Sequence, residues 1–128
     1  MKKIIIALSF LSYLFSIDVT SGGGLSKNQQ GIDIIHYDIR LKVDAKRKMI
    51  SGYTDVKIKV IDEIRFIELD LLKDYFISKV KIDGVTIPFK HRANKIFVKA
   101  QDIELNKTIV VTVCLLYTSD AADEGVRV

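Results

Sequence analysis

The sequence predicts an all-β fold, an antiparallel β-saddle or sandwich-like domain of about seven strands, preceded by a signal peptide. Three observations support this fold class. Apolar and polar residues alternate with a period of two along most of residues 32–113. Short turn-like segments separate these alternating runs, as expected for hairpins. No window in this region shows a sustained helical period, so the predicted core is built from strands.

Length and composition limit the chain to one small domain. It has 128 residues, a formal charge of +4, 48% hydrophobic residues and 28% charged residues. This balance is typical of globular proteins and argues against disorder. The single cysteine excludes an internal disulfide framework, and one cysteine with two histidines excludes a zinc finger.

The N-terminal segment has the layout of a secretory signal peptide. Met1-Lys2-Lys3 forms a basic tip, and residues 4–15 carry no charge. The apolar run is shorter than the roughly 20 residues that span a bilayer, although a buried N-terminal helix or strand is the alternative. We predict a signal peptide over residues 1–21 and a flexible lead-in over residues 22–31. The protein is then expected to be exported to a periplasmic, extracellular or cell-surface location, with membrane contact only through this segment.

Two long strands are expected to begin the domain. Apolar residues alternate with polar ones from Ile35 to Asp44, and again from Ile50 to Val60. The charged turn between them is short, so the two strands should pair antiparallel. Gly52 in the second strand indicates a bulge or a close backbone approach. We expect the first strand to bury Tyr37, Ile39 and Leu41, in which case Ile39→Ala should cost about 2–5 kcal/mol.

Shorter strands follow. Asp83-Gly84 lies between two alternating runs and predicts a tight hairpin. Pro88 lacks an amide donor, so the arm that contains it should be an edge strand. The expected apolar faces of these strands are Ile67, Leu69 and Leu71; Phe76, Val80 and Ile82; Val85, Ile87 and Phe89; Ile96, Val98 and Ala100; and Ile109, Val111 and Val113.

The C-terminal segment is unlike the rest of the chain. Residues 114–124 read CLLYTSDAADE, which resembles the translated transposase adapter used in sequencing libraries. We therefore predict that residues 114–128 are a non-native tail, disordered and dispensable, with a native acidic tail as the alternative. Cys114 is for this reason not assigned as a nucleophile or a ligand.

Four segments, in order, carry a resemblance to a known family. They are Ile35-His36-Tyr37-Asp38-Ile39-Arg40-Leu41, the run from Met49 to Ile58 around Gly52, Ile67-Glu68-Leu69-Asp70, and the run from Ile77 to Gly84. Together with the leader, they resemble the first strands of the N-terminal domain of the aminopeptidase N family of zinc metallopeptidases. The resemblance covers residues 32–113.

The resemblance implies a function for the parent protein rather than for this chain alone. It implies a truncated, non-catalytic β-saddle that flanks the peptide-binding cleft of an exported bacterial aminopeptidase, with zinc in a missing downstream catalytic domain. This chain contains neither the HExxH zinc motif nor the GxMEN segment that holds the substrate's amine. No catalytic, cofactor-binding or metal-binding residue is therefore assigned. The implied partners are the downstream domain of the same chain and peptides in the full-length protein, and nucleic acid is not expected. The alternative is a free-standing secreted β-sandwich used for adhesion or ligand binding.

The residues that could carry chemistry have ordinary structural interpretations. His36 and His91 are too few for a zinc site, which needs at least three protein ligands. Asp38 and Asp44 alternate with Arg40 and Lys42, which indicates a solvated face of mixed charge. The lysines are spread one or two to a strand, as expected for solvated strand faces and edge protection. Two tyrosines in polar surroundings, Tyr53 and Tyr75, could cover a sheet edge or pack under a neighbouring domain.

Overall fold

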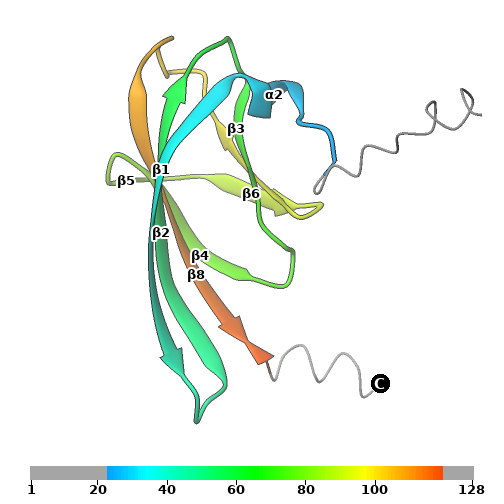
Figure 1. Cartoon of the computed structure of the whole chain (residues 1–128), viewed down its shortest axis with the longest axis vertical. Coiled ribbons are helices and arrows are strands. Elements are labelled where there is room, and N and C mark those ends of the chain that lie inside the picture. Colours follow the sequence, from blue (N-terminus) through cyan, green and yellow to red (C-terminus); the bar gives the residue numbers. More distant parts are fainter. Residues whose placement is uncertain (1–22, 120–128) are drawn as a thin grey trace, which may run out of the picture.

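The computed structural model describes residues 23–119, so the predicted signal peptide lies outside the described residues. Its elements follow one another along the chain as shown in Figure 1: α2 (Lys27–Gln30), β1 (Ile32–Asp44), β2 (Met49–Val60), β3 (Phe66–Asp70), β4 (Phe76–Ile82), β5 (Val85–Ile87), β6 (Phe89–Arg92), β7 (Lys95–Lys99) and β8 (Thr108–Thr118). The predicted all-β, sandwich-like fold class is confirmed.

The strands form two antiparallel sheets. The large sheet has the order β1-β2-β8-β4-β5, and the small sheet has the order β3-β7-β6. Pro88 separates β5 from β6, which are edge strands of different sheets. A residue without an amide donor is tolerated at this crossing because no ladder hydrogen bond is needed there. The edge position predicted for the arm around Pro88 is thus confirmed.

The segment before β1 corrects one prediction. Residues 27–30 were expected to belong to a flexible lead-in, but they form the short helix α2. Ser26 and Gln29 form a capping box, in which each side chain accepts a hydrogen bond from the other residue's backbone N–H. Gly31 then accepts hydrogen bonds from the amides of Ile61 and Asp62, which ties the helix to the loop after β2. These local polar contacts, which a search for apolar periodicity does not detect, order the segment.

The C-terminal end of β8 corrects a second prediction. Residues 114–118 were expected to begin a disordered tail, but they continue β8 as far as Thr118. Leu115 lies opposite Gly52 of β2 and Ile77 of β4, so the strand is paired on both sides. Cys114, Leu115, Leu116 and Tyr117 form an unbroken apolar run, and such a run is compatible with a strand whatever the origin of the segment. Residues 120–128 lie outside the described residues, and the adapter-like origin stays a prediction.

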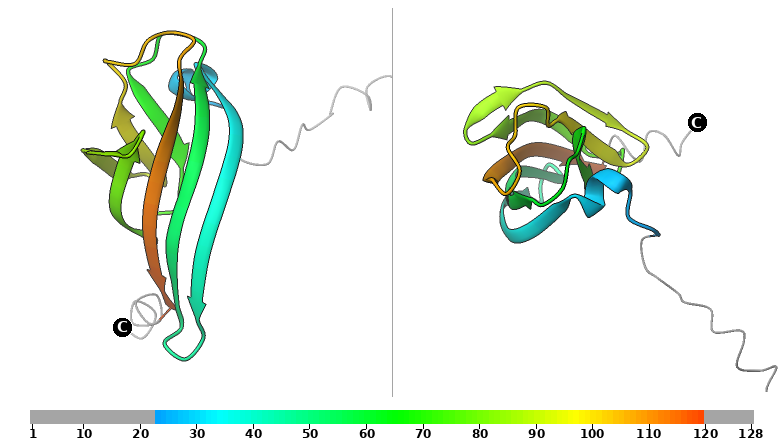
Figure 2. Two further views of the ribbon diagram at one scale, coloured as in Figure 1. Left: turned by 90° about the vertical axis from the view of Figure 1, so that its left-hand side faces the viewer. Right: turned by 90° about the horizontal axis from the view of Figure 1, so that it is seen from above.

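The core lies between the two sheets. Ile58, Val80 and Val111 of the large sheet face Ile67 and Val98 of the small sheet, and none of these side chains is more than 1% exposed. The small sheet is much shorter than β1, β2 and β8. Figures 1 and 2 show these long strands continuing well past it, toward the β1–β2 turn at the end of the molecule farthest from α2. The large sheet therefore has a covered half near α2 and an uncovered half near that turn.

Candidate functional site: an uncovered apolar sheet face

The alternating sequence places one continuous row of apolar side chains along the inner face of the large sheet. The register sets Ile39 opposite Thr54, Leu41 opposite Gly52, and Val43 opposite Ile50. Since side chains two residues apart share a face, this row continues the face that carries the core residues. We call its part beyond the small sheet the uncovered face, formed by Tyr37, Ile39, Leu41, Val43, Ile50, Leu115 and Tyr117.

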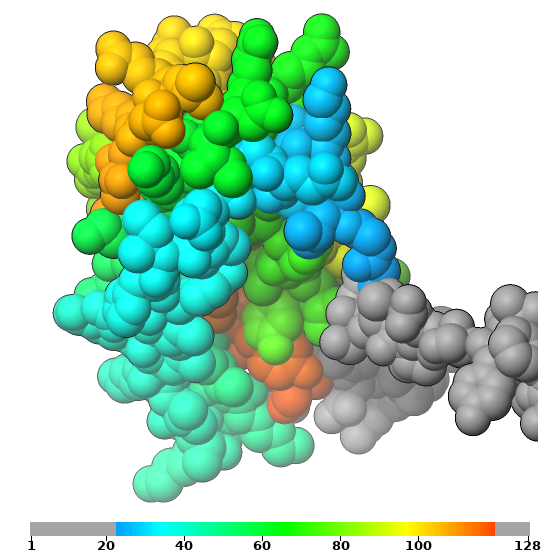
Figure 3. Space-filling model, turned by 45° about the horizontal axis from the view of Figure 1, so that its top comes forward, coloured from blue at the N-terminus to red at the C-terminus, as the bar shows by residue number. Residues whose placement is uncertain are grey.

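The uncovered face is solvent-exposed along β1. Tyr37 is 52% exposed, Ile39 60%, Leu41 52% and Val43 68%. The predicted burial of Tyr37, Ile39 and Leu41 is therefore wrong. The residues lie on the predicted face, but the three-stranded sheet packs only against the other half of the large sheet. In Figure 3, cyan β1 and the orange end of β8 are both visible at the surface, on the side where blue α2 lies.

A cavity marks the boundary between the covered half and the uncovered face. Its volume is about 420 Å³, and its walls come from α2 and its flanks, the large sheet and the small sheet, with Leu25, Ile34, Ile39, Leu69, Val113 and Leu115 among the lining residues. Tyr37 is one of its few polar groups. Burial raises the pKa of the Tyr37 phenol, and the nearby Asp70 carboxylate raises it further. The cavity can accommodate apolar side chains, and it holds the Tyr37 hydroxyl in its neutral form.

Glu68 is the buried charged residue at the edge of this cavity, and it is fully paired. Lys95 Nζ donates a hydrogen bond to Oε1 at 2.5 Å, Ser26 Oγ donates to Oε2 at 2.8 Å, and Asn28 Nδ2 donates to Oε2 at 3.3 Å. Burial raises the pKa of the carboxyl, but the hydrogen bonds from Lys95, Ser26 and Asn28 outweigh this effect and lower it below its ordinary value. Glu68 is therefore ionised at neutral pH and fixes α2 to β3, rather than serving as a proton donor.

The importance of Glu68 was missed by the sequence reasoning. In β3, strict alternation puts Glu68 on the opposite face of the strand from Ile67 and Leu69, which predicts that Glu68 is exposed to solvent. The three residues are nevertheless all buried, because the large sheet covers one side of β3 and the segment around α2 covers the other. The available signal was the capping-box pattern of Ser26 and Gln29, which predicts a helix start directly before β1.

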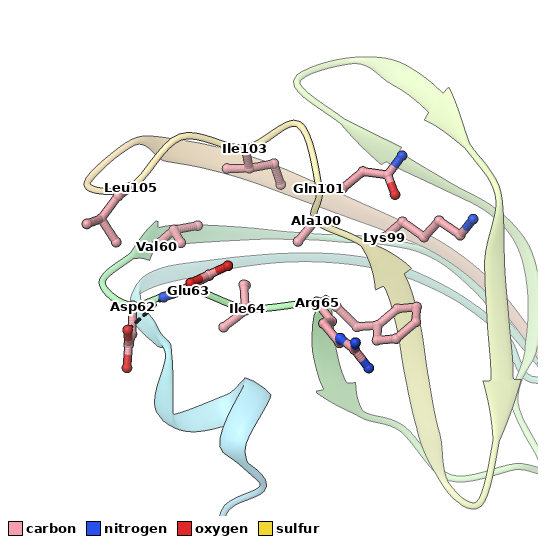
Figure 4. Close-up of a pocket in the computed structure, with 11 residues that line it drawn as sticks. Val60, Asp62, Glu63, Ile64, Arg65, Lys99, Ala100, Gln101, Ile103 and Leu105 are labelled. Carbon is pink, nitrogen blue, oxygen red and sulfur yellow. Dashed lines mark hydrogen bonds between the residues drawn. The ribbon is translucent and has the colours of Figure 1, made fainter.

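A second hollow lies between the loop after β2 and the loop before β8. Its volume is about 840 Å³, and Figure 4 shows acidic Asp62 and Glu63, basic Arg65 and Lys99, and aliphatic residues such as Ile64 around it. The ionisable groups come from exposed loops and strand ends, and acidic and basic side chains are interspersed. This open hollow does not concentrate one charge or one kind of donor, so it is a weaker candidate than the uncovered face.

The two histidines lie in different sheets. His36 is on β1, whereas His91 is on β6, where its Nε2 donates a hydrogen bond to the carbonyl oxygen of Leu71 at 3.0 Å. Within residues 23–119, no group of three or more histidine, cysteine, aspartate or glutamate side chains could hold a metal ion. No helix in the same part of the chain is long and apolar enough to cross a membrane.

The outer face of β1 carries the expected mixture of charges. Arg40 and Asp38 form an exposed ion pair at 2.9 Å, and the Arg40 guanidinium also lies over the ring of Tyr53. Next to the start of β4, the rings of Tyr75 and of Tyr117 in β8 pack with their centroids 5.1 Å apart. Both tyrosines that the sequence left unassigned, Tyr53 and Tyr75, thus have partners within the domain.

Solved structures with a similar fold include an M1 zinc metallopeptidase and a leukotriene A4 hydrolase. No family model and no curated protein matches the sequence. An M1 zinc metallopeptidase from Deinococcus radiodurans superposes with a TM-score of 0.61 and 23% identity, over 70% of this chain and 21% of that one. Yeast leukotriene A4 hydrolase gives a TM-score of 0.63 and 18% identity, over 84% of this chain and 18% of the other. A second structure of that enzyme, from Saccharomyces cerevisiae, gives a TM-score of 0.61 and 19% identity, over 87% of this chain and 19% of the other.

These comparisons show the fold. The chain has the two-sheet β architecture of a domain found in M1 zinc metallopeptidases, and it spans about a fifth of the length of these structures. The fold implied by the resemblance of the four sequence segments agrees with this result. The alternative of a free-standing secreted sandwich finds no support in the comparisons.

Proposed function

We propose that this chain is the non-catalytic N-terminal β domain of an exported aminopeptidase N-like zinc metallopeptidase. Its role is to pack against the downstream part of the same protein and to form one wall of the peptide-binding cleft. Zinc belongs to the catalytic domain, where it activates a water molecule for peptide hydrolysis. The contribution proposed for the described residues of this chain is positioning and restriction of access.

The uncovered face is the observation that carries this proposal. Soluble single domains rarely expose long contiguous apolar surfaces, and such surfaces mark places where another protein layer packs. The residues of this face continue the core without a polar boundary, from buried Val113 to partly exposed Leu115 along β8. Covering each large apolar side chain would contribute roughly 1.5–3 kcal/mol, which makes this half of the sheet a favourable docking site for a second layer.

Recovery of the complete gene tests the proposal. Primers placed within residues 32–113 can extend the sequence downstream in DNA from the source. We expect an open reading frame with further alternating strands and then an HExxH motif. A stop codon directly after the β8 sequence, with no HExxH, would overturn the assignment.

Hydrogen exchange then tests the role of the uncovered face. Amide protection in residues 37–43 should be higher in the full-length protein than in this chain alone, because a second layer would exclude water there. The β3–β7 ladder is the internal control, since the small sheet is already packed in both. Equal protection of residues 37–43 in the two proteins would show that the face is not a docking site, even in a genuine peptidase.

A further inference from the structure

β1 has one backbone edge that no strand of the described chain occupies. It runs for 13 residues, lies at the end of the large sheet and pairs only with β2. The row of backbone donors and acceptors on its other edge is open to pairing with an added strand. The irregularity between Ile34 and His36 interrupts the ladder near the start of β1, and the register from His36 onward is regular.

The sequence of this regular part is self-complementary in an antiparallel arrangement. If Ile39 lies opposite Ile39 of a second copy, Tyr37 lies opposite Leu41 and Asp38 lies opposite Arg40, each pair occurring twice. Apolar residues then meet apolar residues, and opposite charges meet. Directly opposed side chains on antiparallel strands have Cβ atoms about 4.5–5.5 Å apart, within reach of an Asp–Arg ion pair.

We propose that β1 pairs with β1 of a second copy of this chain, in the register that opposes Ile39 to itself. The two large sheets become one continuous sheet across a two-fold axis, which is the usual symmetry of a homodimer. Asp38 and Arg40 already form an exposed ion pair within one strand, so each can exchange its partner for the equivalent residue across the axis. The exposed side chains of Tyr37, Ile39 and Leu41 acquire apolar neighbours at the same time.

This interface is independent of the function proposed above. A layer that covers the uncovered face approaches along the sheet normal, whereas a second β1 approaches in the plane of the sheet, along the hydrogen-bonding direction. The pairing involves about seven residues of each strand, so the contact is at the small end of specific interfaces and the dimer should be a weak one. A chain that does not dimerise would not contradict the peptidase assignment. A full-length gene without HExxH would not contradict the proposed dimer.

Charge reversal tests both the edge and its register. The full chain is studied by sedimentation equilibrium from about 10 µM to 1 mM, a range suited to a weak contact. We expect a reversible monomer–dimer equilibrium for the unaltered chain. Asp38→Arg and Arg40→Asp should each weaken dimerisation at least tenfold, because each places like charges opposite one another. Lys79→Asp, a reversal at an exposed site on β4, is the matched control and should leave the equilibrium unchanged.

The decisive measurement combines the two variants. An equimolar mixture of Asp38→Arg and Arg40→Asp chains should form heterodimers, because opposite charges then face each other at both positions. The double variant Asp38→Arg/Arg40→Asp should also recover the dimer. Unchanged thermal unfolding of every variant confirms that folding is intact. A strictly monomeric unaltered chain at 1 mM, or a dimer indifferent to these reversals, would overturn the proposal.

Discussion

The two halves of the large sheet have the same sequence pattern and opposite environments. In the covered half, Ile58 and Val111 lie on the inner face and are fully buried. In the uncovered half, Ile39 and Leu41 occupy the same face of the same sheet and are more than half exposed. Both halves are paired antiparallel through β1, β2 and β8. Alternation therefore determines which face a residue occupies, whereas burial depends on whether another layer reaches that face.

This difference separates two sources of stability. In the covered half, packing between the sheets stabilises the fold, because each buried side chain is removed from water on all sides. In the uncovered half, apolar side chains gain little from folding, and the strands are held mainly by backbone ladders and by cross-strand neighbours. Substitutions of the same chemical kind should therefore have different costs in the two halves.

The largest expected effect comes from truncating one isoleucine in each half. Ile58→Ala should lower the free energy of unfolding by about 2–5 kcal/mol, since it leaves a cavity between the sheets. Ile39→Ala should cost under about 1 kcal/mol, because its side chain is 60% exposed. Urea denaturation at a few micromolar protein, below the concentrations at which the proposed weak dimer would form, measures both. Equal losses at the two positions would mean that the uncovered face is buried in solution.

A smaller effect is expected at Gly52, where the uncovered half depends on close backbone approach. A Cβ built at this position overlaps the carbonyl oxygen of Arg40, and the backbone φ of +156° is rarely adopted by other residues. Gly52→Ala should force β1 away from β2 and cost about 1–3 kcal/mol. Gly24→Ala is the control, since a Cβ there meets nothing within 4 Å. Equal melting temperatures for both variants would show that β1 and β2 can move apart around Gly52 without loss of stability. The pairing of β1 with β2 in the uncovered half would then contribute nothing to the stability of the fold.

Sequence reasoning succeeded where local pattern decides the outcome. Alternation located the strands, Asp83-Gly84 marked a hairpin, and Pro88 marked an edge, because each depends on neighbouring residues alone. It failed where distant contacts decide. The exposure of Ile39 depends on the length of a second sheet, and the burial of Glu68 depends on a helix some 40 residues earlier in the chain. No local period encodes either fact.

Residues 114–118 form part of a strand, although the sequence analysis expected them to be disordered. Their resemblance to an adapter concerns the origin of the sequence, whereas strand formation depends on apolar side chains and on free neighbouring edges. β2 and β4 present such edges to Leu115 and Leu116, and the segment pairs with both. The physical criterion, rather than the origin of the residues, therefore predicts the local structure.

The smallest expected effect concerns Glu68, which ties α2 to the covered half. Its pKa is lower in the folded chain than the ordinary value of about 4.3 for an unfolded glutamate. A group whose folded pKa is lowered stabilises the fold above the unfolded pKa and loses this contribution as pH falls through the folded pKa. Glu68→Gln should therefore cost about 1–2 kcal/mol at pH 7, where the charged hydrogen bond from Lys95 is lost, and progressively less as the pH falls below about 4.3.

Urea denaturation from pH 3 to pH 7 gives the free energy of unfolding of the unaltered chain and of Glu68→Gln. The difference between the two should shrink as the pH falls, and taking the difference cancels the titration of the other carboxylates. Glu63→Gln is the matched control, because Glu63 is exposed and its substitution should change the free energy of unfolding only slightly. The Lys95 ammonium remains charged throughout this range, since Glu68 raises its pKa, so the change reports Glu68 alone. A constant difference between Glu68→Gln and the unaltered chain from pH 7 to pH 3 would show that the carboxylate is not preferentially ionised in the fold. Convergence would show that the covered half is held by the ion pair of buried Glu68 with Lys95 as well as by packing, whereas the Asp38–Arg40 ion pair of the uncovered half is exposed to solvent.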